Sequence, residues 1–220
     1  MADSILLMNL SVTQFGQVLD PSKYTWDEST NTFSTNESNL VLDFLGIEGV
    51  TFKTGTDCTF NTSFGCTFNT SFGCNFNTSY NCTFKTGYGC NFNTGSNCTF
   101  NTSFDCTFKT DTGCTFNTSF GCTFNTGYVC TFNTGDGCNF NTGDGCTFKT
   151  GDCCNIGVYQ NIKSIKCESD CIVIIRGLDK NYKKMNKKES LLNIRSDDSI
   201  IRTMAYCKLN KIDCIIKHSI

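Results

Sequence analysis

Cysteine is the residue in this chain whose type and spacing most directly suggest chemistry. It recurs at every eighth residue through the middle of the 220-residue sequence, at Cys58, Cys66, Cys74, Cys82, Cys90, Cys98, Cys106, Cys114, Cys122, Cys130, Cys138, Cys146 and Cys154. Cysteines can form disulfides, bind metal ions or act as nucleophiles, and each of these roles requires particular neighbours. The chemistry open to this series of cysteines, which we call the cysteine ladder, therefore depends on the neighbours of each cysteine in the fold.

Two interpretations of the cysteine ladder stay open at the level of sequence. In the first, the thiols are reduced and serve as small apolar core side chains. In the second, disulfides join successive coils, because adjacent β-strands lie about 4.8 Å apart and disulfides accept Cα separations of about 4.4–6.8 Å. Cys58 and Cys66 form one such candidate pair. Counting free thiols in the denatured, unreduced protein distinguishes the two.

Metal binding and catalysis are poorly supported by the remaining residues. Zinc sites use cysteine pairs two to four residues apart, often with histidine, whereas the only histidine here is His218, near the end of the sequence. Cys167, Cys171, Cys207 and Cys214 could form a four-cysteine site, but we interpret them as cap residues. The sequence has no phosphate-binding loop and no dinucleotide-binding fingerprint. We predict no metal site, no cofactor and no enzymatic activity.

The cysteines belong to an eight-residue repeat whose consensus is Cys-Thr-Phe-Asn-Thr-Gly-x-Gly. Thirteen copies occupy residues 50–153, and we number their positions 1 to 8. Positions 1, 3 and 5 share the parity of one strand face, and positions 2 and 4 are polar. Glycine, serine, aspartate and asparagine dominate positions 6 and 8, which predicts a turn with φ > 0 at position 8.

This pattern predicts an all-β protein, a narrow β-solenoid with eight residues per coil, about 13–14 coils and caps at both ends. We expect an N-terminal cap over residues 1–49, the solenoid over 50–157 and a C-terminal cap over 158–220. Position 3 should form a core phenylalanine ladder that contains Phe52, Phe60, Phe68, Phe76, Phe84, Phe92, Phe100, Phe108, Phe116, Phe124, Phe132, Phe140 and Phe148.

Two surfaces are candidates for assembly, because a rigid rod without catalytic residues is most simply a structural or scaffolding protein that self-associates. Position 7 is variable and predicted to be exposed, and its aromatic members are Phe64, Phe72, Tyr80, Tyr88, Phe104, Phe120 and Tyr128. The ends differ in charge: residues 1–49 carry a net charge of −6 and residues 155–220 carry +6. Lateral aromatic packing or end-to-end charge pairing would follow.

Other functions remain as alternatives. The solenoid wall, or the basic residues in 180–188, could bind a glycan or a nucleic acid, although nucleic acid is disfavoured because a solubilising loop explains the lysines. Threonine at position 2 could form an ice-binding rank, but Asn75, Asn91 and Asn139 interrupt it and lysine occupies position 4 of the same face. Association through charge weakens with salt, whereas aromatic packing persists.

The sequence also suggests a compartment. The first residues lack the basic start of a secretory signal, and no stretch approaches the roughly 18 apolar residues that span a bilayer. We expect an intracellular protein with no membrane partner, where thiols usually stay reduced.

The repeat "CTFNTG", the leader "YTWDESTNTFSTNESNLVLDF" and the later element "DCIVIIRG" resemble the cysteine-rich octapeptide-repeat β-solenoid proteins of giant viruses of the mimivirus kind. The likeness covers roughly residues 20–176, and the tail from Leu178 departs from it. The family brings no established activity. The resemblance implies a virion or a viral factory in the host cytoplasm as the setting, and it agrees with the solenoid prediction.

Overall fold

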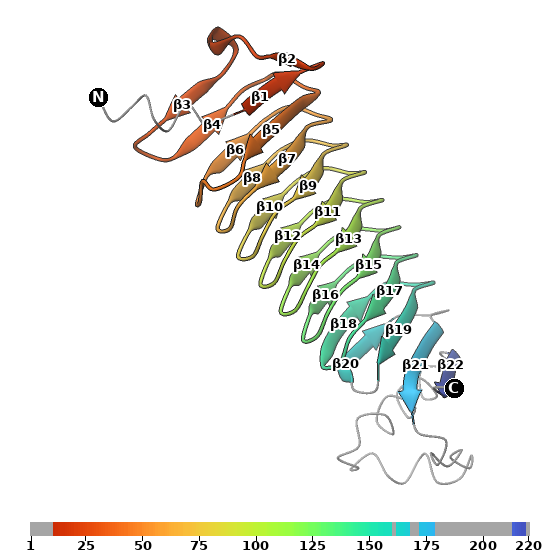
Figure 1. Ribbon diagram of the computed structural model, residues 1–220. Coiled ribbons are helices and arrows are strands. Elements are labelled where there is room, and N and C mark those ends of the chain that lie inside the picture. Colours follow the sequence, from red (N-terminus) through yellow and green to blue (C-terminus); the bar gives the residue numbers. More distant parts are fainter. Residues whose placement is uncertain (1–10, 160–161, 168–171, 179–212, 219–220) are drawn as a thin grey trace, which may run out of the picture.

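Two β-sheets run along the length of a rod and share one core (Figure 1). The computed structural model describes residues 11–159, 162–167, 172–178 and 213–218. Sheet A contains, in spatial order, β2 (Gln17–Val18), β1 (Ser11–Gln14), β5 (Leu40–Phe44), β7 (Thr59–Thr62), β9 (Asn75–Asn77), β11 (Asn91–Asn93), β13 (Thr107–Lys109), β15 (Thr123–Asn125), β17 (Asn139–Thr142), β19 (Asn155–Tyr159), β21 (Ile172–Leu178) and β22 (Asp213–His218). Sheet B contains β20 (Ile162–Cys167), β18 (Cys146–Thr150), β16 (Thr131–Asn133), β14 (Thr115–Asn117), β12 (Thr99–Asn101), β10 (Thr83–Lys85), β8 (Thr67–Asn69), β6 (Thr51–Lys53), β4 (Thr32–Ser34) and β3 (Thr25–Asp27).

The coil is twice as long as the sequence repeat. Strand β7 pairs with β9 in parallel, with Thr59 opposite Asn75, sixteen residues further on. Sheet B follows the same rule, with Thr83 of β10 opposite Thr99 of β12. The predicted β-solenoid is therefore confirmed, but a coil holds two octads rather than the predicted one, and there are about 8 turns rather than 13–14. One octad supplies a single strand and a single chain reversal, and a closed path requires two of each.

The strands are short, and their side chains alternate between core and solvent. In β8 the outer residues Thr67 and Asn69 are exposed while Phe68 is fully buried. The same exposed–buried–exposed pattern repeats in the strands from β8 to β16. This is the period of two that an extended chain imposes, and it confirms the inward placement of position 3.

The turns depend on a left-handed residue at position 8. All thirteen octads have a positive φ there, between 54° and 71°: Asp57, Gly65, Gly73, Asn81, Gly89, Asn97, Asp105, Gly113, Gly121, Val129, Gly137, Gly145 and Cys153. Eleven are glycine, asparagine or aspartate, the residues that tolerate this conformation best. Val129 and Cys153 are the exceptions, and Val129 is β-branched.

Phenylalanine rings from both sheets fill the core in a herringbone. Within a sheet, the rings of Phe84 and Phe100 stack at 4.8 Å with their planes 3° apart. Across the core, Phe84 meets Phe92 edge to face at 5.2 Å and 76°. The predicted phenylalanine ladder is confirmed, since all thirteen rings are at most 4% exposed. Each ring thus gains both of the favourable aromatic geometries, offset stacking along the sheet and T-shaped contact across it.

Antiparallel hairpins close the N-terminal end of the rod. Strand β1 pairs antiparallel with both β2 and β5, and β3 pairs antiparallel with β4. The parallel ladder already starts with β4 and β5, which continue into β6 and β7. Trp26 of β3 packs against Phe44, the last residue of β5. The antiparallel strands therefore cover the first rings of the core.

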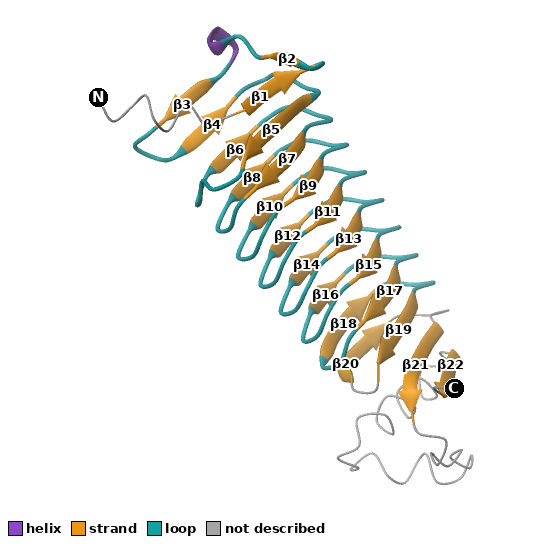
Figure 2. Cartoon of the chain, viewed as in Figure 1, coloured by secondary structure: helices purple, strands orange, loops and turns teal. Residues whose placement is uncertain are grey.

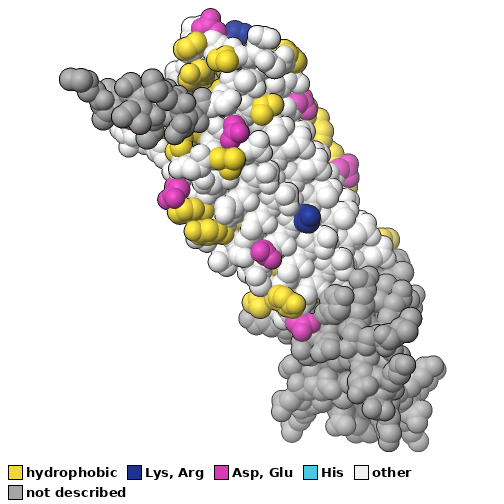
Figure 3. Space-filling model, viewed as in Figure 1, with side chains coloured by type: hydrophobic (Ala, Val, Ile, Leu, Met, Phe, Trp, Pro, Cys, Tyr) yellow, Lys and Arg dark blue, Asp and Glu magenta, His cyan; other side chains and the backbone are white. Residues whose placement is uncertain are grey.

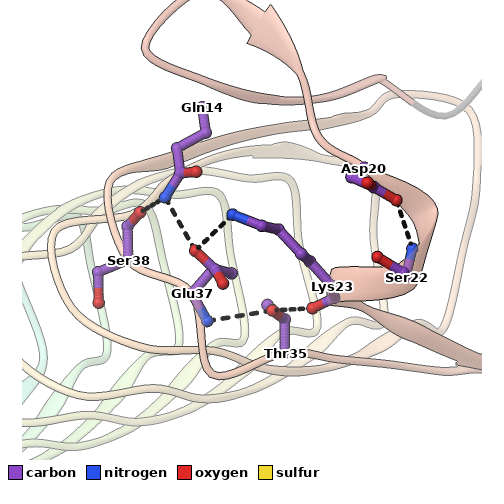
Figure 4. Close-up of polar contacts among 7 residues, drawn as sticks. All are labelled: Gln14, Asp20, Ser22, Lys23, Thr35, Glu37 and Ser38. Carbon is purple, nitrogen blue, oxygen red and sulfur yellow. Dashed lines mark hydrogen bonds and ion pairs between the residues drawn. The ribbon is translucent and has the colours of Figure 1, made fainter.

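Polar contacts fix the loops of this hairpin region (Figure 4). Gln14 donates through Nε2 to a Glu37 carboxylate oxygen at 3.2 Å and to the Ser38 carbonyl at 2.9 Å. Glu37 also lies 3.6 Å from the Lys23 amine, and Thr35 donates to the Lys23 carbonyl at 2.7 Å. Lys23 ends the 3₁₀ helix η1 (Pro21–Lys23), the one helix of the described chain (Figure 2). No helix among the described residues has the length and apolar character of a membrane span.

The turn geometry generates a prediction at Val129. A non-glycine residue in the left-handed region destabilises the fold by about 1–2 kcal/mol. Replacing it with glycine removes this cost, but part of the gain is lost because glycine has more conformational freedom in the unfolded chain. Val129 is 60% exposed, so removing its side chain loses little burial. We expect Val129→Gly to raise the free energy of unfolding by about 1 kcal/mol, measured by urea denaturation.

Gly89→Val supplies the matched control. Gly89 occupies the same turn position with φ +65°, and a Cβ built there has no atom within 4 Å, so strain alone should act. We expect a loss of about 1–2 kcal/mol. Equal effects of the two substitutions, in the same direction, would contradict the role assigned to position 8.

Candidate functional site

The repeat cysteines form two buried columns, one along each side of the core. Column A runs beside sheet A and contains Cys58, Cys74, Cys90, Cys106, Cys122, Cys138 and Cys154. Column B runs beside sheet B and contains Cys66, Cys82, Cys98, Cys114, Cys130 and Cys146. Every one of these thiols is at most 1% exposed. The columns are therefore lines of sulfur atoms inside the rod, spaced one per coil.

One coil repeats the next by nearly pure translation. Rings sixteen residues apart, such as Phe92 and Phe108, lie 4.8 Å apart with planes 3° from parallel. The amide of Asn75 donates to the carbonyl of Cys58 at 2.8 Å, which ties Cys58 to the coil that holds Cys74. Equivalent atoms of adjacent coils, including the sulfurs of one column, are consequently about 4.8 Å apart.

The structure corrects the pairing proposed for the cysteines. Cys58 and Cys66 belong to opposite columns of the same coil, so they are not neighbours across a coil interface. The neighbour of Cys58 is Cys74. The fourteen cysteines whose side chains the structure describes, including the exposed Cys153, are in the thiol form. Of the two interpretations, the reduced ladder is the one present in the structure.

Backbone carbonyls of the turns surround each thiol. The Sγ atom of Cys98 lies 3.6 Å from the carbonyl oxygens of both Ser79 and Ser96. The same two contacts, to the residue two before and the residue nineteen before, recur from Cys74 to Cys154. Because a thiol has one proton, each S–H can donate to one of its two acceptors at a time.

Neighbouring thiols in a column are close enough to couple their ionisation. The pKa of Cys98 is raised, first by hydrogen bonding with the thiols of Cys114 and Cys82 and then by burial. A thiolate at Cys82 would accept the S–H groups of Cys66 and Cys98, which lowers the pKa of Cys82. Ionisation of one thiol therefore holds the thiols above and below it in the protonated form.

Buried threonine hydroxyls at position 5 accompany the thiols, and their chemistry was not anticipated from sequence. Their Oγ1 atoms have no hydrogen-bond partner at Thr54, Thr62, Thr70, Thr78, Thr94, Thr102, Thr110, Thr118, Thr126, Thr142 and Thr150. The Thr78 hydroxyl lies close enough to influence the Cys82 thiol four residues later. Strand parity places these residues inward, but only the structure shows that the thiol of the cysteine four residues later lies beside the hydroxyl, as Cys82 does beside Thr78.

The two outer faces of the rod differ, which the octad pattern alone conceals. Position 2 of sheet B is threonine without interruption: Thr51, Thr67, Thr83, Thr99, Thr115, Thr131 and Thr147. The asparagines that break the threonine rank in the sequence, Asn75, Asn91 and Asn139, all lie on sheet A. There they form side-chain ladders, such as Asn91 to Asn75 at 3.0 Å.

The predicted aromatic face is divided between two opposite edges. Phe72, Tyr88, Phe104 and Phe120 follow strands of sheet B and stack continuously, with centroids 4.8, 4.9 and 4.9 Å apart. We name these four residues the aromatic strip. On the other edge Phe64 stacks on Tyr80 at 4.9 Å, and Ser96 and Thr112 separate that pair from Tyr128. Figure 3 shows one face, where hydrophobic side chains form separate groups on a mostly uncharged surface.

An open hollow of about 440 Å³ lies where the N-terminal hairpins meet sheet B. Its charged lining residues are Lys23 and Lys53, both exposed, and Lys23 is paired with Glu37. The hollow therefore offers polar surface without a buried charged group.

No cluster of three or more histidine, cysteine, aspartate or glutamate side chains suited to a metal ion occurs within the described residues. Cys171, Cys207 and the lysine-rich residues 180–188 lie outside the described residues. Cys167, Cys214 and His218 lie on described strands, β20 and β22, without described side chains. The prediction of cap cysteines thus stays a prediction.

Fold and site together define a two-sheet β-solenoid with internal thiol columns. Comparisons with family models, with curated proteins and with solved structures find no match for the chain.

The unpartnered hydroxyls generate a prediction at Thr102, which is 8% exposed. Valine has the same shape and no hydroxyl, and a buried group without a partner costs about 1–3 kcal/mol. We expect Thr102→Val to stabilise the fold by about 1 kcal/mol, measured by urea denaturation. Thr99→Val on the exposed face of sheet B serves as the control and should change stability by less than about 0.5 kcal/mol. A destabilised Thr102→Val protein would show that the hydroxyl has a partner.

Proposed function

We propose that this chain is a non-enzymatic structural rod that associates side by side with a second copy through the aromatic strip. The observation that carries the proposal is the strip itself, four stacked rings on one edge, of which Tyr88 is 43% and Phe120 50% exposed. Phe72 and Phe104 are half-buried, which departs from the exposure predicted for position 7, so Tyr88 and Phe120 supply most of the apolar area that a partner can cover.

A second copy of this chain fits the strip better than an unrelated surface does. The rings of the strip repeat every 4.8–4.9 Å, the spacing of the coils. A second rod presents rings at the same period, so the outer edges of the two rows can pack against each other in register along the strip. Few other surfaces have this spacing, because it arises from stacked β-strands.

The core supports the structural role. Phenylalanine rings contact one another in series from Phe33 to Phe148, the thiols belong to the same buried cluster, and each coil is hydrogen-bonded to the next. Such a rod resists bending, because every coil bears on its neighbours through the same contacts. The resemblance of the repeat and leader to giant-virus octapeptide-repeat proteins supports a virion or viral factory as the setting.

Light scattering after size exclusion tests the proposal with two matched double variants. Tyr88→Ser with Phe104→Ser removes the centre of the aromatic strip, and we expect the association constant to fall tenfold or more, since each aromatic contact contributes about 0.5–1.5 kcal/mol. Phe64→Ser with Tyr128→Ser removes two rings from the opposite edge and should leave association unchanged.

Salt separates lateral packing from end-to-end charge pairing. Association through the strip should persist at high salt, whereas contacts between oppositely charged ends should weaken steeply. A protein that stays strictly monomeric at high concentration, or equal behaviour of the two double variants, would remove the strip from the proposal.

A specific observation also favours a second candidate, ice binding through sheet B. Seven threonines stand in an unbroken rank there, and the interrupting asparagines are on the other sheet. In the middle of the face, Thr99, Thr115 and Thr131 stand beside uncharged asparagines rather than lysines. The rank offers hydroxyl and methyl groups at one regular spacing of about 4.8 Å.

Thermal hysteresis tests this candidate directly. If sheet B binds ice, Thr115→Lys should abolish ice shaping, while Thr123→Lys on sheet A should not. Absence of ice shaping by the unaltered protein excludes the candidate.

A further inference from the structure

The spacing of the thiol columns does not suit disulfide bonds. A disulfide requires Cβ atoms about 3.5–4.5 Å apart, with a mean near 3.8 Å. Coils related by pure translation hold equivalent Cβ atoms about 4.8 Å apart, as the 4.8 Å separation of Phe84 and Phe100 confirms for the rings. Joining Cys82 to Cys98 would therefore require two coils to move together against a core that is already in contact.

The same spacing suits a metal ion held between two sulfurs. A thiolate sulfur lies about 2.3 Å from a bound d¹⁰ ion such as zinc, so two sulfurs on opposite sides of one ion are about 4.6 Å apart. Zinc itself wants four ligands in a tetrahedron, which a single column does not supply. Soft monovalent d¹⁰ ions, Cu(I) and Ag(I), accept two sulfurs in a line, and thiolates select such ions.

The surroundings of the columns favour a neutral, desolvated complex. The thiols are buried, so a charged complex would be penalised. The unpartnered hydroxyls of Thr70 and Thr78 lie beside Cys74 and Cys82. These buried oxygen atoms have free lone pairs next to the sulfurs and can turn toward a cation. The thiols and the threonine hydroxyls therefore form a buried line of polar groups along each column.

We propose that adjacent thiols of one column bind soft monovalent d¹⁰ ions, with Cu(I) as the physiological ion. Each ion lies between two neighbouring coils and is bound by one thiol from each of them. Binding converts two thiols and one ion into one thiolate and one thiol on the same metal, and releases one proton. No electron is transferred, and the complex is neutral. The remaining S–H keeps its bond to a turn carbonyl, such as that of Ser79 beside Cys98.

Pairing limits the number of ions. A sulfur shared by two ions in one straight column would need a metal–sulfur–metal angle near 180°, which sulfur disfavours. Column A has seven thiols and column B has six, so each accommodates three separate pairs. The columns together hold about six ions per chain.

Native mass spectrometry with silver nitrate tests the proposal on the reduced, full-length chain. Ag(I) is the probe because it is not oxidised in air. Exposed thiols such as Cys153 are first blocked with iodoacetamide under native conditions, which leaves the columns untouched. Circular dichroism confirms that each protein is folded. We expect about six ions on the unaltered protein.

Two cysteine-to-alanine substitutions in column A distinguish ion binding by pairs of thiols from ion binding by single thiols. Cys74→Ala isolates Cys58 and leaves five thiols in a row, so column A should lose one ion. Cys90→Ala leaves a pair and a row of four, so column A should keep three ions. Cys138→Ala and Cys122→Ala repeat the comparison from the other end, should the first pair of variants fold poorly.

Equal losses in Cys74→Ala and Cys90→Ala would show one-by-one binding and overturn the proposal. Failure of silver to bind the blocked, folded protein would overturn it as well. Neither result bears on lateral association, which uses the aromatic strip and is measured without metal.

Discussion

The parallel hydrogen bonds between coils are the interaction on which the rest of this structure depends. They set a spacing of about 4.8 Å along the rod, and every side chain that points inward must stack at that distance. A flat ring can do so, which explains why phenylalanine fills position 3 in all thirteen octads. A small thiol can do so as well, and it leaves the corner of the coil narrow enough for the turn carbonyls to close over it.

The narrow interior also explains why threonine hydroxyls are buried in the core. Eight residues per side leave room for one ring, one thiol and one threonine, and eleven of the threonine hydroxyls are buried without a hydrogen-bond partner. Threonine is retained because its β-branch suits an extended strand and its methyl group packs beside the rings. The inter-coil backbone bonds and the stacked rings offset the cost of the unpartnered oxygens.

Much of this architecture could be predicted from sequence, and the part that could not has a physical cause. Parity at positions 1, 3 and 5 identified the buried residues, and the glycine-rich turn identified the positive φ at position 8. The coil length was missed because the two octads of a coil are nearly identical, so the sequence period is half the structural one. A weak sixteen-residue signal was present: Asn75, Asn91 and Asn139 all fall in octads of the same parity.

That missed factor of two changes the chemistry of the site more than it changes the fold. With one octad per coil, Cys58 and Cys66 would be neighbours and the aromatic residues would form a single row. With two octads, the thiols separate into two columns and the rings into two edges, of which only one is continuous.

Because adjacent coils are related by a translation, the spacing of the thiols within a column determines what can bind between them. Disulfides pull two residues out of register, whereas a linear ion leaves every coil where the backbone hydrogen bonds place it. A protein whose core is a stack of identical layers tolerates only ligands that respect the layer spacing. The thiol columns therefore favour a soft ion between coils over a covalent bond between them, for the same reason that the rings stack.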